Sequence, residues 1–224
     1  MSLATPVRDL GQRMVLEGIR WKTYEALLED LAGQRLRLTY DRGALEIMSP
    51  RLDHEKYKTL LGRMVEAMTE ELAIPLASAG STTWKSLAKE KGLESDESYY
   101  VQNEPRMRGR LDFDPSEDPP PDLAIEVEIT ASALDRLGIY AALGVPEIWT
   151  YDGRKLSFLV LGRRGEYAAA VSSFAFGFLQ PGDLERFLSK FQETDETTWI
   201  RGFRRWVREE LAGKAKTPPR KKRR

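Results

Sequence analysis

The chain has 224 residues, with 35 Lys plus Arg against 35 Asp plus Glu, so its formal net charge is zero. It contains no Cys and one His, which excludes disulfides, thiolate zinc sites and multi-histidine metal centres. Any metal site would therefore use carboxylate oxygens, which favour Mg²⁺, Mn²⁺ or Ca²⁺. With 41% hydrophobic residues the chain is too apolar for a disordered protein, and it has no apolar run near the roughly 18 residues of a membrane span.

The zero net charge conceals a basic C-terminus. Residues 1–213 carry a formal charge of −7, because every charged residue after Gly213 is basic: Lys214, Lys216, Arg220, Lys221, Lys222, Arg223 and Arg224. We expect a single domain over residues 1–212 and a disordered basic tail over residues 213–224. Such a tail either binds nucleic-acid backbone or only aids solubility. The start, MSLATPVRDL, lacks the pattern of a secretory signal, so we expect a cytoplasmic protein with no membrane partner.

The N-terminal half predicts a helix at 23–31, a hairpin and a long helix. In RLRLTYDRGALEIM, two strands flank an Asp-Arg-Gly turn at 41–43, and the first strand buries one face through Leu36, Leu38 and Tyr40. The segment MSPRLDHEKYKTLLGRMVEAMTEEL follows, with apolar residues at helical spacing: Leu60, Leu61, Met64, Val65, Met68 and Leu72.

The C-terminal half alternates strands and helices. We predict strands at 98–102 and in PDLAIEVEIT after a loop at 112–121, and a helix at 132–143 that is capped by Ser132 and ends at Gly144. A hairpin, PEIWTY to KLSFLVL, turns at Asp152-Gly153, and helices at 183–191 and 197–211 follow. The last helix presents a core-facing stripe: Trp199, Phe203, Trp206 and Val207. This order predicts an α/β fold with a mixed β-sheet flanked by helices.

Three acids lie on one face of the strand in PDLAIEVEIT. Its period of two separates Leu123, Ile125, Val127 and Ile129 from Asp122, Ala124, Glu126 and Glu128. Glu126 and Glu128 would lie roughly 6.6 Å apart, at about 3.3 Å per residue. Carboxylates this close repel one another, and a divalent cation would relieve the repulsion. The alternative is a half-exposed edge strand whose acids simply face water.

A further acid, Asp96, precedes the predicted strand at 98–102. Adjacent strands lie about 4.8 Å apart, so Asp96 is a candidate to share a cation with Glu126. The alternative is a loop acid that begins a turn. The sequence by itself leaves both interpretations open.

Three segments resemble a known bacterial family: LEIMSPRLDHEKY, GLESDESYYVQNE and DPPPDLAIEVEITASALDRLGIYAALGVPEIWTYDG. They are similar to the Uma-two family of restriction-endonuclease-like proteins, in the PD-(D/E)XK nuclease superfamily. The resemblance runs from about residue 35 to residue 206. It implies a restriction-endonuclease-like (PD-(D/E)XK) core, a mixed sheet flanked by helices, with an active site of acids on two neighbouring strands.

The resemblance also implies roles for individual residues. Asp96 matches the first aspartate, Glu126 the second acid, and Glu128 the position where the superfamily usually has lysine. Arg136 occupies the place of a basic residue in the following helix, where it would stabilise transition-state charge. His54, at the start of the long helix, either lines the site or is an ordinary helix residue. Glu46 and Glu55 are weaker candidates, and we expect Glu46 to be structural.

Together these features predict a metal-dependent DNA endonuclease that uses Mg²⁺ or Mn²⁺ bound by Asp96, Glu126 and Glu128. A homodimer would help such an enzyme to reach both DNA strands. The rival interpretation is a catalytically inactive module that keeps the nuclease fold and binds nucleic acid or another partner, which the missing lysine favours. A hydrolase of another phosphate ester is a third alternative.

Overall fold

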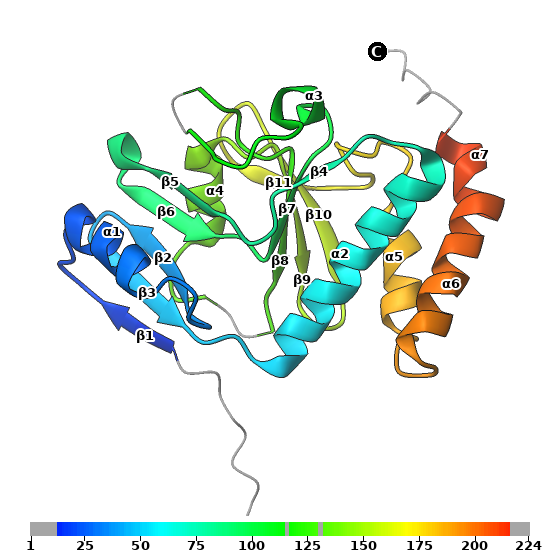
Figure 1. The fold of residues 1–224 in the computed structure, drawn as a ribbon, viewed down its shortest axis with the longest axis horizontal. Coiled ribbons are helices and arrows are strands. Elements are labelled where there is room, and N and C mark those ends of the chain that lie inside the picture. Colours follow the sequence, from blue (N-terminus) through cyan, green and yellow to red (C-terminus); the bar gives the residue numbers. More distant parts are fainter. Residues whose placement is uncertain (1–12, 115–116, 130–131, 216–224) are drawn as a thin grey trace, which may run out of the picture.

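Two β-sheets and the surrounding helices make up the computed structural model, which describes residues 13–114, 117–129 and 132–215 (Figure 1). The predicted α/β class is confirmed, and one of the sheets is the expected mixed sheet. The N-terminal hairpin does not join that sheet but builds a second one, because its apolar residues Leu38, Tyr40 and Leu45 pack in a cluster of their own.

The five-stranded sheet has the order β1-β3-β2-β6-β5, and its neighbouring strands are antiparallel. Its strands are β1 (Arg13–Leu16), β2 (Arg37–Asp41), β3 (Ala44–Met48), β5 (Thr83–Ser86) and β6 (Lys91–Glu94). Helix α1 (Trp21–Asp30) covers it and stacks Tyr24 on Tyr40 with ring centroids 4.9 Å apart. The predicted turn between β2 and β3 is confirmed: Arg42 and Gly43 have φ angles of 44° and 97°, and glycine enters this left-handed region readily.

The six-stranded sheet has the order β11-β10-β9-β8-β7-β4. Its strands are β4 (Ala77–Ser78), β7 (Glu97–Tyr100), β8 (Leu123–Val127), β9 (Glu147–Tyr151), β10 (Leu156–Leu161) and β11 (Tyr167–Ala170). β8 and β9 are parallel, and the other neighbouring pairs are antiparallel. Helix α4 (Arg136–Leu143) makes the crossover between the two parallel strands.

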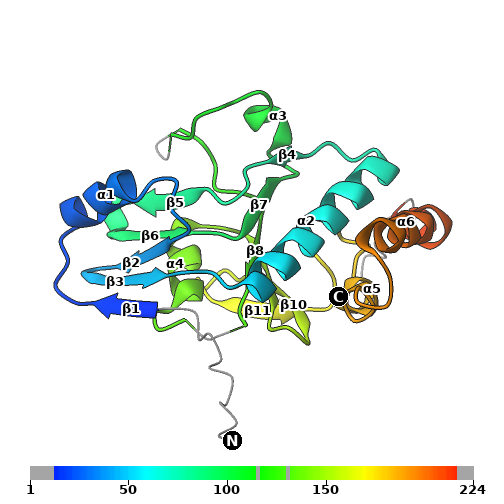
Figure 2. The same ribbon diagram turned by 60° about the horizontal axis from the view of Figure 1, so that its bottom comes forward.

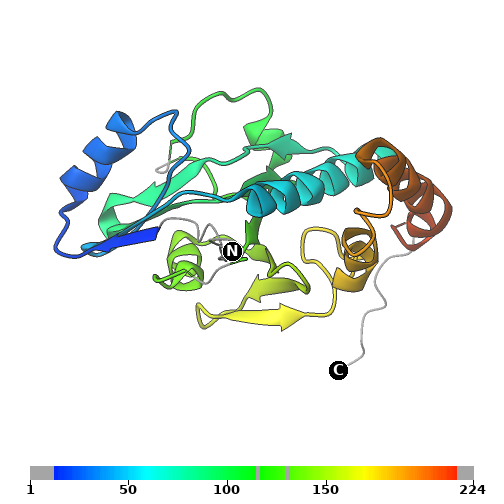
Figure 3. The same ribbon diagram turned by 90° about the horizontal axis from the view of Figure 1, so that it is seen from below.

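Helices cover both faces of the six-stranded sheet. Helices α2 (Leu52–Leu72), α5 (Pro181–Leu188) and α6 (Glu196–Trp206) pack on one face, where α2 crosses the strands diagonally (Figure 1), and α4 packs on the other. The five-stranded sheet and the α5–α6 pair lie at opposite ends of the molecule (Figures 2 and 3). The predicted stripe Trp199, Phe203, Trp206 and Val207 is buried, as expected. Shorter helical segments are α3 (Glu104–Met107), a 3₁₀ turn (Leu87–Lys89), a π-helical turn (Val207–Leu211) and α7 (Ala212–Ala215).

The central position of β8 decides between the two interpretations of its acids. Leu123, Ile125 and Val127 join the core beneath α2, whereas Ala124 packs with α4 on the opposite face. Glu126 is only 4% exposed, so the interpretation of a half-exposed edge strand is wrong. Helices on both faces remove solvent from the acidic side of this strand as well as from its apolar side.

Three local predictions need correction. β2 buries Arg37 and Thr39 as well as Leu38 and Tyr40, so it has two buried faces where one was expected. Helix α4 begins at Arg136, and its cap is Asp135, whose carboxylate accepts from the backbone N–H of Gly138 at 2.9 Å. Ser132 is not the cap, because its hydroxyl turns to Glu46.

The predicted tail at 213–224 falls mostly outside the described residues. Its first residues continue α7, and Lys214 Nζ lies 3.3 Å from Asp183 Oδ1. Within the described ranges, no helix combines the length and apolarity needed to cross a bilayer.

Candidate active site

A cavity of about 30 Å³ lies where the start of α2 and the end of β8 meet the five-stranded sheet. The structure brings all five predicted site residues to its wall: His54, Asp96, Glu126, Glu128 and Arg136. These residues are up to 82 positions apart in the chain, from 54 to 136. The cavity has room for a single water molecule or ion.

Asp96 is buried just before β7 and is held from several sides. Its backbone N–H donates to the Ile125 carbonyl at 3.2 Å, and the Val127 N–H donates to its Oδ2 at 2.6 Å. Arg37 Nη1 lies 3.2 Å from Oδ1, and His54 Nε2 lies 3.1 Å from Oδ2. Burial raises the pKa of Asp96, but these donors and positive charges outweigh it and hold the pKa below its usual value. Asp96 is therefore an ionised buried carboxylate.

Glu126 forms a forked ion pair with Arg136. Arg136 Nη2 donates to Oε1 at 2.6 Å, Nε donates to Oε2 at 3.1 Å, and the Tyr140 hydroxyl also donates to Oε1. Arg136 further donates to Thr39 Oγ1 at 2.7 Å and to the Glu94 carbonyl at 2.8 Å, which fixes its position between the two sheets. Burial raises the pKa of Glu126 to about 7, although Arg136 opposes that change. The pair is thus fully desolvated and firmly oriented.

His54 lies in the first turn of α2 and has a partner on each ring nitrogen. Nε2 faces Asp96, and Nδ1 lies 3.2 Å from Glu55 Oε1. Burial lowers the pKa of His54, but the hydrogen bonds to both carboxylates outweigh it and raise the pKa to about 9. His54 is therefore a cation at neutral pH that orients Asp96, and both its nitrogens act as donors.

The other two acids of the predicted acidic face lie outside the strand: Asp122 comes just before β8 and Glu128 just after it. β8 ends at Val127, so Glu128 follows the strand, although its N–H still donates to the Tyr151 carbonyl at 2.8 Å. Its half-buried side chain lines the cavity. Asp122 instead accepts from the backbone N–H groups of Val101 and Asn103, both at 2.8 Å, and so holds the turn after β7.

Glu46, on β3, anchors the segment that leads into α4. It accepts from the Ser132 hydroxyl at 3.0 Å and from the Ala133 N–H at 2.6 Å, and it lies 3.7 Å from Arg13 Nε. Glu46 also lines the cavity. Its contacts match the structural role expected for it, because they set the position from which α4 presents Arg136.

The donor chemistry of the cavity fits a hard divalent cation. Asp96, Glu126 and Glu128 all line it, and carboxylate oxygens suit Mg²⁺ or Mn²⁺. Among the described residues, however, no three acidic or histidine side chains already surround one point as a metal cluster would. Two of the carboxylates are instead paired with Arg136, Arg37 and His54. An entering cation would compete with those pairs.

A larger groove of about 480 Å³ opens beside the cavity and shares Arg37 with it. Its walls carry four basic side chains, Arg35, Arg37, Arg51 and Lys58, against two acidic ones, Glu55 and Glu94. We call it the basic groove. Arg37, Arg51 and Lys58 each lie within 3.8 Å of a carboxylate oxygen, so only part of the positive charge of this groove is available to an anion.

Sequence reasoning missed three residues that complete the site: Arg37, Thr39 and Tyr140. Arg37 and Thr39 lie on the face of β2 that was expected to be solvent-exposed. Tyr140 follows Arg136 by one helical turn, so the i, i+4 spacing on α4 was an available signal that both side chains reach Glu126.

Comparison with known proteins gives one family. The family model Uma2, described as "Putative restriction endonuclease", matches residues 21–192. This span contains all five predicted site residues. No curated protein matches the chain.

Proposed function

Because this chain belongs to the Uma2 family of restriction-endonuclease-like proteins, we propose that it hydrolyses phosphodiester bonds in DNA with the help of a bound divalent cation. The observation that carries the proposal is the convergence of Asp96, just before β7, and Glu126, on the neighbouring strand β8, on one small cavity beside a basic groove. Buried acids gathered next to an anion-binding surface are typical of sites that bring a metal and a phosphate together.

Asp96, Glu126 and Glu128 are the residues that would hold Mg²⁺ or Mn²⁺. The bound ion would polarise the phosphodiester and lower the pKa of the attacking water. Its double positive charge would also offset the repulsion among these acids. Glu128 stands where the superfamily usually has lysine, and a carboxylate there adds a ligand in place of a cation.

Arg136 and His54 have different tasks in this proposal. Arg136 keeps its charge at any working pH, so it stabilises negative charge that develops on the phosphate but does not accept a proton. It must loosen one of its bonds to Glu126 in order to do so. His54 is a positioning residue, because both its nitrogens are bound to Asp96 and Glu55.

The basic groove is the path we propose for the DNA backbone. Its basic residues lie beside the cavity, and Arg37 belongs to both, so a strand held there would lie next to Asp96. Phosphates neutralised by Lys and Arg release counterions, which makes such binding strongly salt-dependent. We further propose a homodimer that places two such sites on one duplex, and a cytoplasmic location, where bacterial DNA is found.

The test is cleavage of plasmid, linear and single-stranded DNA with Mg²⁺, Mn²⁺, Ca²⁺ or chelator. Asp96→Asn and Glu126→Gln should abolish metal-dependent cleavage, since both remove a ligand charge without changing side-chain size. Glu147→Gln is the matched control: Glu147 is a buried glutamate on β9 that binds Ser173 and Ala175 and does not line the cavity. Thermal melts of all three variants verify folding. Cleavage that persists in Asp96→Asn and Glu126→Gln would refute the proposal.

A catalytically inactive module that binds nucleic acid is the second candidate. It is favoured by the pairing of both acids with protein cations and by Glu128 at the lysine position. Such a module would bind DNA equally well with metal or chelator and would show no carboxylate-dependent heat on titration with Mn²⁺. The enzyme would show that heat, and Glu126→Gln would reduce it.

A further inference from the structure

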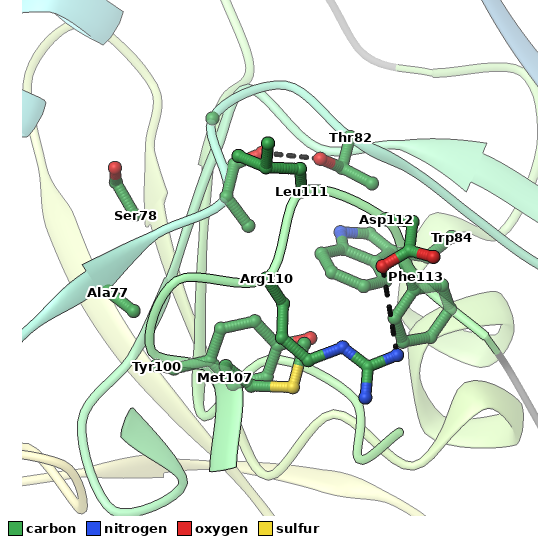
Figure 4. A pocket seen from close by; sticks show the side chains of 12 residues that line it. Ala77, Ser78, Thr82, Trp84, Tyr100, Met107, Arg110, Leu111, Asp112 and Phe113 are labelled. Carbon is green, nitrogen blue, oxygen red and sulfur yellow. Dashed lines mark hydrogen bonds and ion pairs between the residues drawn. The ribbon is translucent and has the colours of Figure 1, made fainter. Parts of the chain in front are cut away.

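A second large cavity, of about 450 Å³, lies near the basic groove and contributes nothing to the site described above. We call it the aromatic pocket. It is lined by side chains from β5, β7, α3 and the segment after α3, notably Trp84, Tyr100, Met107, Arg110 and Phe113 (Figure 4). Its volume falls within the range of small-molecule sites.

Aromatic rings form one wall of this pocket. Phe113 meets Trp84 edge to face, with ring centroids 4.7 Å apart, and Tyr100 meets Trp84 at 6.3 Å (Figure 4). Trp84 is held in place, because its Nε1 donates to Ser95 Oγ at 3.2 Å. Phe113 is only half-buried, so part of its ring faces the pocket. Trp84 and Tyr100 are buried, so Phe113 is the one of these three rings that is accessible from the pocket.

The polar groups of the pocket are balanced in charge. Arg110 Nη2 lies 3.8 Å from Asp112 Oδ1 (Figure 4) and 3.1 Å from Oδ2 of Asp118, which lies outside the pocket lining. The guanidinium is thus compensated by two carboxylates, which disfavours a phosphate at this point. Aromatic rings with a few polar groups suit a flat, uncharged and polar ring, and a nucleobase has these properties.

A short loop separates the aromatic pocket from the basic groove. Ser81 lines the basic groove, and its two neighbours, Gly80 and Thr82, line the aromatic pocket. Thr82 donates to the Ala79 carbonyl, which closes this loop tightly. A strand whose phosphates lie on the groove side needs to pass only this loop to place a base in the pocket.

We propose that the aromatic pocket binds one unpaired base of the DNA strand whose backbone lies in the basic groove. This inference rests on the proposed function and extends it, because it names the substrate class as single-stranded or locally unpaired DNA. A paired base cannot enter, since its Watson–Crick edge and both faces are occupied in the duplex. Stacking on aromatic side chains holds bases of any identity, so we expect little sequence preference.

The experiment compares two fluorescent 12-nucleotide strands in chelator: oligothymidine, and a strand of the same length whose sugars all lack bases. Both carry the same phosphates, so their difference in affinity reports base contacts alone. The full-length protein should bind oligothymidine about tenfold more tightly, within the range for one base stacked on an aromatic ring. Fluorescence anisotropy at fixed salt measures both affinities.

Two substitutions remove the accessible ring. Phe113→Ala deletes it, and Phe113→Leu keeps apolar volume without an aromatic face; both should abolish the tenfold preference and leave binding of the base-free strand unchanged. Phe174→Ala is the control, because Phe174 is a 59% exposed phenylalanine that does not line the pocket. Thermal melts identify any variant that fails to fold. If Phe113→Ala does not fold, the affinities of Phe113→Leu test the inference.

The outcomes separate this inference from the proposed function. Equal affinity of the parent for both strands, or an undiminished preference in Phe113→Leu, overturns the base pocket alone. Binding of neither strand overturns the base pocket, and if duplex DNA with Ca²⁺ also fails to bind, the nucleic-acid function is overturned with it. If free thymidine displaces both strands at the same concentration, it acts at the surface that both strands share and not in the aromatic pocket, and the inference is wrong.

Discussion

Replacing Arg136 with methionine would leave Glu126 as a buried carboxylate without its guanidinium partner. Methionine keeps an apolar stem of similar length, so the perturbation is mainly the loss of charge and of five donor contacts, to Glu126, Thr39 and the Glu94 carbonyl. Breaking one side of a buried ion pair costs about 3–5 kcal/mol, because the remaining charge stays desolvated. We expect a loss of that size in the free energy of unfolding at pH 8.

The loss should depend on pH in a defined direction. The pKa of Glu126 is raised to about 7 by burial in the parent, and without Arg136 it rises further. A carboxyl whose pKa is raised in the folded state binds its proton more tightly there, so stability falls as the pH rises from about 4.5 towards the folded pKa. Near pH 5, Glu126 is largely protonated, so its pairing with Arg136 contributes less to the free energy of unfolding. The destabilisation at pH 8 should therefore exceed that at pH 5 by at least about 1 kcal/mol.

Urea unfolding of four proteins at pH 5 and pH 8 tests this reasoning: the parent, Arg136→Met, Glu126→Gln and the double variant. The double variant should recover part of the loss, because no unpaired charge remains. Arg204→Met is the matched control, since Arg204 pairs with Glu70 and Glu71 at the surface and such pairs contribute about 1 kcal/mol or less. If the losses of the two single variants simply add in the double variant, and if each loss is the same at pH 5 and pH 8, the buried-pair argument is refuted.

Three further outcomes are expected. The pKa of His54 is raised from 6.5 to about 9. Its contribution to the free energy of unfolding, up to about 3 kcal/mol, is therefore present below pH 6.5 and disappears as the pH rises to 9. In His54→Gln the free energy of unfolding, measured in urea from pH 6 to pH 10, should change less with pH. Glu128→Gln should weaken Mn²⁺ binding about tenfold in calorimetry while the melting temperature is unchanged, because fewer ligand charges lower cation affinity. Deleting residues 216–224 removes six basic residues and keeps the Lys214–Asp183 pair. The plot of log DNA affinity against log salt concentration should then become less steep, because fewer counterions are released. An unchanged slope would show that the tail does not contact DNA.

Part of the candidate site followed from local sequence. The alternation in PDLAIEVEIT, the helix stop at Gly144 and the aromatic segment after Asp96 predicted two strands and a helix, and family resemblance joined them into one site. Geometry brings these residues together around one cavity, although their catalytic and metal-binding roles are proposals. Arg37 was not identified, because an arginine that alternates with apolar residues in a strand has the same pattern whether it faces water or a buried aspartate.

The sequence by itself determined the elements whose causes are local. The turn at residues 41–43, the apolar period of α2 and the strand β8 depend on residues a few positions apart, and these elements were predicted correctly. Only the tertiary structure decided which faces lost their solvent. Glu126 is buried because α4 and the five-stranded sheet cover the polar side of β8, and that cover includes residues as distant in sequence as Thr39, 87 positions earlier. Periodicity reports what a strand presents on each face, whereas burial depends on what the rest of the chain places against it.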